Sequence, residues 1–181
     1  MARDFIVVPE ALEAGGDGRP TDRPSFAYRQ VLDHVARLAG AGDRVFLAPA
    51  NSMGGPTTEE LAAWAYLANR GPHAFAFFCP GVNLGDYRHD GSYVDTWGNA
   101  ARLARVLDHR AAEFDLVVAA PHARRAAWCF RRFGYRIRKV HPVSLEMRPG
   151  RLVARHFYYR HPWLHRLYEA LALIRDRWRH R

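Results

Sequence analysis

The segment DLVVAAPHARRAAWCFRRFGYRIRKV, residues 115–140, carries the clearest indication of the fold. It begins with an apolar run, Asp115–Ala120, which is typical of a buried strand. A helical pattern follows from Ala123 to Arg132, and Arg136–Val140 is predicted to form another strand. A strand, a helix and a second strand in this order predict a right-handed crossover that joins two parallel strands.

The same alternation runs along the rest of the chain. Further strands are predicted at residues 4–8, 44–48 and 74–79, and helices at residues 25–38, 57–70, 95–109 and 162–178. We therefore expect an α/β fold with a doubly wound, mainly parallel sheet, arranged as a Rossmann-like three-layer sandwich with a C-terminal amphipathic helix. The length of 181 residues fits a single domain that spans residues 1–181.

Several local patterns refine this outline. Ser25 is expected to cap the first helix, and Thr57 with Glu60 forms a capping-box pattern before the second. Residues 15–24 are rich in Gly, Pro and Asp and are expected to be the most mobile segment. Residues 143–147 and 152–158 are candidates for a short hairpin. The last helix has an apolar face that we expect to pack on the core: Leu164, Leu167, Tyr168, Leu171, Ile174 and Trp178.

The chain is basic, with 27 Lys and Arg against 18 Asp and Glu and a formal net charge of +9. Such a charge is compatible with nucleic-acid binding. However, no zinc-finger or RNA-recognition motif is present, and the basic residues are spread through segments that resemble a packed core. Nucleic acid is therefore not the expected partner. An alternative in which Arg175, Arg177, Arg179 and Arg181 bind nucleic acid or an anionic surface is less favoured than a solvated end of a core helix.

Neither a membrane span nor a signal peptide is predicted. The apolar runs are far shorter than the roughly 20 residues that a transmembrane helix needs. The N-terminal MARDFIVVPE has about four consecutive apolar residues, fewer than the apolar region of a signal peptide. We therefore expect a cytoplasmic protein. The sequence does not indicate its oligomeric state.

Several well-known motifs are absent or incomplete. There is no G-x-x-x-x-G-K-[ST] phosphate loop and no G-x-G-x-x-G after a strand. Ser52, Asp95 and His122 follow the order of a Ser–Asp–His triad, but residues 54–56 separate the serine from the next helix, so a plain Gly-rich loop is favoured over a nucleophile elbow. His161 and His165 have a spacing seen in metal sites, yet no third ligand is evident and no metal site is expected.

The carboxyl ends of parallel strands are where ligands bind in such sheets. The loops at these ends contain the polar residues that we regard as candidate site residues: Asn51, Ser52, Asp95, Thr96, Asn99 and His122. Glu59 opens the helix that follows the second strand.

The helix that begins near Ala123 has an unusual charge distribution. His122, Arg124 and Arg125 lie at its N-terminus, where the helix dipole disfavours positive charge. An acidic partner or a bound anion is therefore needed to stabilise them. Arg131 and Arg132 lie at the C-terminal end, where the dipole favours positive charge. Only the first group calls for a functional explanation.

At these residues the sequence resembles the YdcF/SanA/ElyC-like family of bacterial proteins, whose function is largely unknown. The segment Ala120–Ala126, with His122 and Arg125, is similar to the family's His-x-x-Arg-Ala motif, and Asp95–Ala100 resembles its Thr-x-Glu-Asn-Ala segment. Looser similarities are found at residues 29–38, 45–47, 54–55 and 58–71, and at Glu169. The sequence departs from the family pattern at Pro9-Glu10, in place of a Leu-Gly turn, and at Gly98, in place of an acidic residue.

The resemblance implies a Rossmann-like sheet whose motifs meet at its carboxyl edge, with S-adenosylmethionine as a candidate ligand or cofactor. The residues by themselves identify no cofactor. We expect an anionic small molecule, phosphorylated or nucleotide-like, as the ligand. Catalytic roles are predicted for His122, Glu59 and Asp95, and ligand-binding roles for Asn51, Ser52, Thr96, Asn99 and Arg125. His122 is the candidate general acid or base, oriented by Asp95 or Glu59, and Arg125 is the candidate anion-binding residue.

Two classes of function are therefore open. One is a hydrolase or transferase that acts on a phosphate or glycosidic bond. The alternative is a non-catalytic protein that binds S-adenosylmethionine or a nucleotide, which Gly98 in place of an acidic residue favours.

Overall fold

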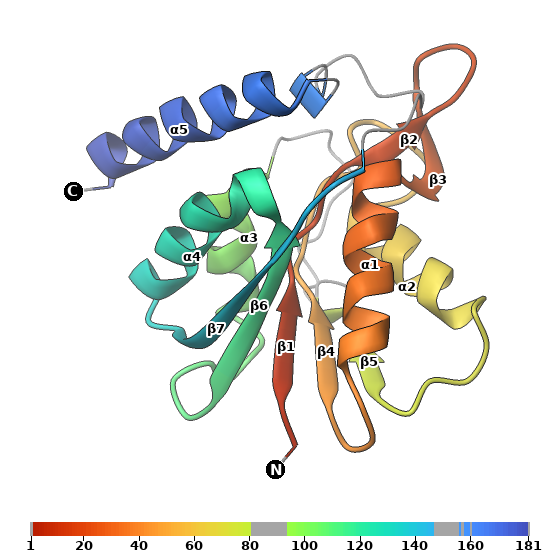
Figure 1. The fold of residues 1–181 in the computed structure, drawn as a ribbon, viewed down its shortest axis with the longest axis vertical. Coiled ribbons are helices and arrows are strands. Elements are labelled where there is room, and N and C mark those ends of the chain that lie inside the picture. Colours follow the sequence, from red (N-terminus) through yellow and green to blue (C-terminus); the bar gives the residue numbers. More distant parts are fainter. Residues whose placement is uncertain (1, 81–93, 147–155, 157, 160, 181) are drawn as a thin grey trace.

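The computed structural model describes residues 2–80, 94–146, 156, 158–159 and 161–180. Its centre is a parallel sheet with the strand order β5-β4-β1-β6-β7, in which every neighbouring pair is parallel (Figure 1). The strands are β1 (Asp4–Val7), β4 (Arg44–Leu47), β5 (Ala76–Phe78), β6 (Glu113–Ala119) and β7 (Arg136–Val143). The predicted fold class, a doubly wound parallel sheet in a three-layer sandwich, is confirmed.

Helices cover both faces of this sheet because successive strand residues point to opposite sides. Phe5 and Val7 of β1 pack against α1 (Phe26–Leu38) and α2 (Glu59–Ala68). Ile6, between them, packs against α3 (Thr96–Leu103) and α4 (Ala123–Arg132) on the other face. Buried apolar runs in β1, β4 and β6 are thus explained by two apolar cores, one on each side of the sheet.

The strand order creates a divergence between β1 and β6. From β1 the chain proceeds to β4 and β5 on one side, and then crosses to β6 and β7 on the other side. The connections that leave β1 and β6 therefore run to opposite faces, which opens a crevice at their carboxyl ends. This is the switch point at which ligands bind in open α/β sheets.

A small second sheet changes the prediction for residues 15–24. The antiparallel strands β2 (Leu12–Ala14) and β3 (Pro20–Pro24) pair across a turn at Gly18, whose φ is +77° (Figure 1). The Thr21 hydroxyl donates a hydrogen bond to the Glu13 carbonyl at 3.1 Å. Residues 20–24, in the segment predicted to be the most mobile, thus form a strand because their backbone pairs with β2.

Several predicted boundaries differ from the structure. The α2 helix is capped by Thr58, whose hydroxyl accepts a hydrogen bond from Leu61 N, and not by Thr57. The α3 helix ends at Leu103, six residues before the predicted end at His109. Strand β7 extends to Val143 and includes the first residue of the predicted hairpin. In the second strand of that hairpin, predicted at residues 152–158, only His156 and Tyr158 are described, and neither lies in a strand.

The last helix, α5 (Pro162–Arg179), lies over the carboxyl edge of the sheet, above α4 (Figure 1). It buries His165, Glu169, Ala172, Leu173 and Asp176. The prediction that its apolar face packs on the core is wrong for four of the six residues: the exposed fractions of Leu167, Leu171, Ile174 and Trp178 are 49%, 59%, 64% and 74%. Leu164 and Tyr168 do pack, against an aromatic cluster with Phe26.

None of the helices in the described part of the chain combines the length and the apolar character that crossing a bilayer requires.

The helix cap can be tested directly. Thr58→Ala should lower the free energy of unfolding by about 1 kcal/mol, because it removes the acceptor for a backbone N–H at the α2 N-terminus. Thr57→Ala is the matched control and should change stability by less than about 0.5 kcal/mol. Urea unfolding of both variants checks this; a larger effect at Thr57 would mean that the capping box predicted from the sequence is the one that forms.

Candidate functional site

Most of the predicted site residues meet at the switch point between β1 and β6. A small cavity of about 30 Å³ lies there. It is lined by seven of the eight predicted residues: Asn51, Glu59, Asp95, Thr96, Asn99, His122 and Arg125. Its remaining walls include Tyr158, Tyr159 and Glu169. A volume of this size holds one or two water molecules.

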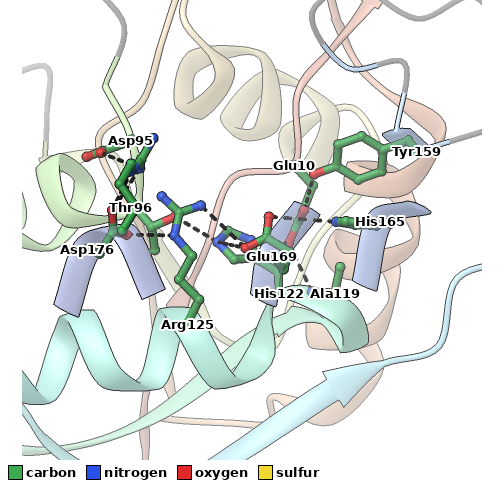
Figure 2. Close-up of polar contacts among 11 residues, drawn as sticks. Glu10, Asp95, Thr96, Ala119, His122, Arg125, Tyr159, His165, Glu169 and Asp176 are labelled. Atoms are coloured by element: carbon green, nitrogen blue, oxygen red, sulfur yellow. Dashed lines mark hydrogen bonds and ion pairs between the residues drawn. The ribbon is translucent and has the colours of Figure 1, made fainter. Parts of the chain in front are cut away.

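The centre of the site is a hydrogen-bonded series of three side chains, Glu10, His122 and Thr96 (Figure 2). Thr96 Oγ1 lies 2.7 Å from His122 Nε2, and His122 Nδ1 lies 3.2 Å from Glu10 Oε1. All three residues are at most 6% exposed. A hydroxyl, an imidazole and a carboxylate in this order form the arrangement that orients a histidine for proton transfer.

Glu10 is held in place from three sides. Its backbone carbonyl accepts a hydrogen bond of 2.6 Å from the hydroxyl of Ser25, which also caps α1. Its side-chain oxygen Oε1 accepts from Ala119 N at 3.0 Å, and Oε2 accepts from the Tyr159 hydroxyl. The next residue, Ala11, has a φ of +74°, an uncommon conformation for a residue with a side chain. The turn after β1 is therefore built to direct the Glu10 carboxylate over the end of β6.

The charges of His122 and Glu10 stabilise each other. Burial alone would lower the pKa of His122, but the nearby carboxylates of Glu169 and Glu10 outweigh burial and raise it. Burial alone would raise the pKa of Glu10, but the charge of His122 and its hydrogen bond lower it. The site thus favours an imidazolium beside a carboxylate. In that state His122 Nε2 carries a proton and donates a hydrogen bond to the Thr96 hydroxyl.

Arg125 shows how the helix tolerates positive charge at its N-terminus. Its Nε donates to Asp176 Oδ2 at 2.8 Å, and its Nη1 donates to Glu169 Oε2 at 3.3 Å (Figure 2). Glu169 Oε2 also lies 3.9 Å from His122 Nε2. Of the two alternatives for stabilising His122 and Arg125, an acidic partner within the chain is therefore present, and α5 supplies it.

One donor of Arg125 remains unused. Its Nη2 atom is buried and has no hydrogen-bond partner in the described part of the chain, although the residue is only 3% exposed. An unpaired guanidinium nitrogen in such a place costs free energy unless water or a ligand pairs with it. Arg125 lines the small cavity, so this donor is available to a molecule bound there.

Polar side chains also fix the start of α3. The Asn51 side chain donates from Nδ2 to the Val94 carbonyl at 2.7 Å and accepts from Val94 N. Asp95 caps the helix by accepting from Gly98 N at 3.0 Å, and its other oxygen accepts from Arg175 at 3.4 Å. Asn99 donates to the Pro49 carbonyl. Three predicted site residues, Asn51, Asp95 and Asn99, therefore position Thr96 through the backbone around it.

Glu59 lies on the wall of the same cavity and has an unusual protonation equilibrium. Its burial raises its pKa from 4.5 to about 7, although backbone and side-chain hydrogen bonds from Asn51 oppose this. The Asn51 N–H donates to Glu59 Oε2 at 3.0 Å. A carboxyl group with a pKa near neutral is suited to exchange protons at physiological pH. The residue that contacts the His122 imidazole, however, is Glu10 and not Glu59 or Asp95.

Ser52 lies in a loop and does not line the small cavity, and Gly98 lies in the first turn of α3. Ser52 is buried, and its carbonyl accepts from Gly55 N in a tight turn, as in a plain loop. At Gly98, an added Cβ would lie 2.9 Å from Val94 Cγ1, too close for an ordinary contact. Because this contact is with a side chain, a larger residue at position 98 requires the Val94 side chain to move.

A larger cavity of about 610 Å³ adjoins the small one and shares Arg125 and Glu169 with it. It lies between α5 and the start of α4, and its walls include the apolar side chains of Leu145, Leu173 and Ile174. Arg124, Arg166 and Arg177 also line it, and they form no ion pair with any residue that the structure describes. Its volume is typical of small-molecule sites.

Within the described residues, His, Cys, Asp and Glu side chains form no group of three or more that suits a metal ion. His161 is exposed, whereas His165 is buried beside Tyr158 and Tyr159.

Comparison with known proteins adds no assignment. No family model, curated protein sequence or solved structure matches this chain. The resemblance to the YdcF/SanA/ElyC-like motifs therefore stays a prediction.

Several residues of the site were not among the predicted ones: Glu10, Tyr159, His165, Glu169 and Asp176. Glu10 lies three residues after the end of β1, and the rule that ligands bind at carboxyl ends was sufficient to select it. Glu169 and Asp176 lie on a helix 44 and 51 residues after Arg125 in the chain. Both interrupt an otherwise apolar and basic helix with acidic residues, and Glu169 is also one of the positions that resemble the YdcF/SanA/ElyC-like family.

The raised pKa of Glu59 predicts a specific dependence of stability on pH. Between pH 4.5 and about 7 the folded chain holds the Glu59 proton while the unfolded chain has lost it, so stability decreases as pH rises through this range. Glu59→Gln should be more stable than the wild type above pH 7, by up to roughly 3 kcal/mol, and equal to it near pH 4. Urea unfolding of both proteins between pH 4 and pH 8 measures this difference in the free energy of unfolding. The exposed Glu113→Gln serves as control, and an unchanged pH profile for Glu59→Gln would contradict the assignment.

Arg125 should contribute strongly to stability. Arg125→Ala removes the buried cation that Glu169 and Asp176 share, which leaves Asp176 with Arg175 alone, and should cost about 3–5 kcal/mol. The neighbouring Arg124→Ala should cost less than about 0.5 kcal/mol, because Arg124 is exposed. Chemical unfolding of both variants distinguishes the two arginines; equal effects would contradict the ion pairing described above.

Proposed function

We propose that the chain binds an anionic small molecule at the carboxyl edge of the sheet and hydrolyses or transfers a phosphate or glycosidic bond there. The observation that carries this proposal is the series Glu10–His122–Thr96 at the switch point between β1 and β6. A buried imidazolium that is oriented by a carboxylate, beside a cavity, is suited to general acid catalysis.

Two groups supply the acid and the base. His122 is the acid, and its Nε2 proton passes to a leaving-group oxygen that takes the place of Thr96 Oγ1. Glu59, with a pKa of about 7, is the base and takes a proton from a water or a hydroxyl group in the small cavity. The oxygen that loses this proton bonds to phosphorus or to the anomeric carbon, and the bond from that atom to the leaving-group oxygen breaks. Different environments thus assign opposite roles to two titratable groups.

The arginines account for the preference for an anion. The free Nη2 of Arg125 is a donor for an anionic oxygen next to the reacting groups. The remainder of the ligand extends into the larger cavity, where Arg124, Arg166 and Arg177 provide positive charge. Glu169 and Arg125 belong to both cavities, so a ligand in the larger one reaches the reacting groups where these two side chains meet. Arginine suits phosphate because its planar fork donates two parallel hydrogen bonds.

Activity measurements test this proposal. Chromogenic phosphomonoesters, phosphodiesters and glycosides, together with nucleotides and sugar phosphates, are assayed for turnover by the wild type and by His122→Gln. The variant should lose about 10²–10⁴-fold in kcat/KM because general acid catalysis is removed. In the wild type, kcat/KM should rise with pH as Glu59 loses its proton around pH 7, and should decrease as His122, whose pKa is raised above its ordinary value, loses its own.

The control for this experiment is His161→Gln, an exposed histidine at the same edge, which should keep wild-type activity. Turnover that is unchanged in His122→Gln would contradict the proposal.

A second candidate function is non-catalytic binding of S-adenosylmethionine or a nucleotide. It is favoured by the larger cavity, whose volume of about 610 Å³ fits such a ligand, and by the strand order, which is that of nucleotide-binding sheets. Titration of these ligands without any turnover, and with an affinity that His122→Gln leaves unchanged, would favour this function over catalysis.

A further inference from the structure

The outer side of α5 carries a continuous apolar stripe. Trp163, Leu167, Leu171, Ile174 and Trp178 follow one another at intervals of three or four residues, which places them along one side of a helix. Their exposed fractions range from 49% to 74%. The structure describes other exposed large apolar residues, such as Trp64 on α2 and Val106 after α3, but these lie outside α5. A contiguous apolar surface of this kind marks an interaction site.

The charges around the stripe are of one sign. Arg166 and Arg177 lie next to it on the side of the larger cavity, which they line together with Ile174. Arg179 is exposed near the end of the helix. The only acidic residues of α5, Glu169 and Asp176, are 5% and 1% exposed and face Arg125. The outward side of the helix is therefore apolar in the middle, basic at its margins and free of carboxylates.

We propose that the outer face of α5 docks on an anionic lipid bilayer, with the helix lying parallel to the membrane surface. The apolar stripe enters the boundary between head groups and acyl chains, and the flanking arginines contact lipid phosphates. Tryptophan at both ends, Trp163 and Trp178, suits this boundary because its ring is partly apolar and partly polar. The net charge of +9 adds a general attraction to anionic lipid.

A second copy of the chain fits this face less well. Contact between two α5 stripes brings Arg166, Arg177 and Arg179 of both copies together, and α5 offers no exposed carboxylate to compensate them. Anionic head groups supply the missing negative charge. None of the stripe residues lines the small cavity, although Ile174, Arg166 and Arg177 also line the larger cavity of the proposed function.

The test is cosedimentation of the full chain with vesicles of phosphatidylcholine alone and of phosphatidylcholine mixed with phosphatidylglycerol. The wild type should bind the anionic vesicles at least about tenfold more tightly than the neutral ones. Leu167→Ser with Leu171→Ser should weaken this binding by at least about tenfold, since apolar area is lost from the contact. Arg166→Gln with Arg177→Gln should weaken it by about tenfold through lost charge.

Matched controls separate these effects from general ones. Arg37→Gln with Arg110→Gln removes the same charge at the opposite, amino edge of the sheet, and Trp64→Ser removes an exposed apolar side chain on α2; both should bind like the wild type. No preference for anionic vesicles would overturn the proposal, as would binding that the two serines leave unchanged. Self-association of the wild type that the two serines abolish, in the absence of vesicle binding, would also overturn it and assign the stripe to a second copy.

Discussion

Arg125 is held between the carboxylates of Glu169 and Asp176, and much of the molecule depends on this contact. It joins the first turn of α4 to α5, the last helix of the chain. These three charges are buried, and a buried charge without a partner destabilises the fold. The arginine and the two carboxylates therefore stabilise the fold only when they are paired with each other. The same contact draws the acidic side of α5 onto the carboxyl edge of the sheet, so the helix closes the small cavity and turns its apolar stripe outward.

The site that results combines a sheet edge common to many proteins with a local arrangement of charges. The switch point between β1 and β6 brings Glu10 and His122 together, whereas α5 adds Glu169 from above (Figure 2). Carboxylates on two sides outweigh burial and raise the pKa of His122, and burial raises the pKa of Glu59 to about 7. Glu10 supplies the carboxylate next to the histidine, whereas position 98 is a glycine. A proton donor and a proton acceptor thus face one small cavity.

The fold and most of the site residues were predictable because they depend on local pattern and on a general rule. Alternating apolar runs and helical patterns indicated the parallel sheet, and the carboxyl-end rule selected Asn51, Asp95, Thr96, Asn99 and His122. Ser52 was selected by the same rule but lies away from the small cavity, because the rule locates loops and not side-chain directions. The roles differed more than the positions: Asn51, Asp95 and Asn99 bind backbone groups, and Glu10 took the orienting role expected of Asp95 or Glu59.

The sequence by itself determined the order along the chain of the helices and of the main-sheet strands, the edge at which polar residues gather, and the need for negative charge near His122 and Arg125. Only the tertiary structure decided where that charge comes from, since Glu169 is 44 residues away from Arg125 along the chain. It also decided which side of α5 is buried. Periodicity predicted that the apolar side would face the core, but pairing buried arginine with two carboxylates required the opposite orientation, and the leucines and tryptophans were left exposed.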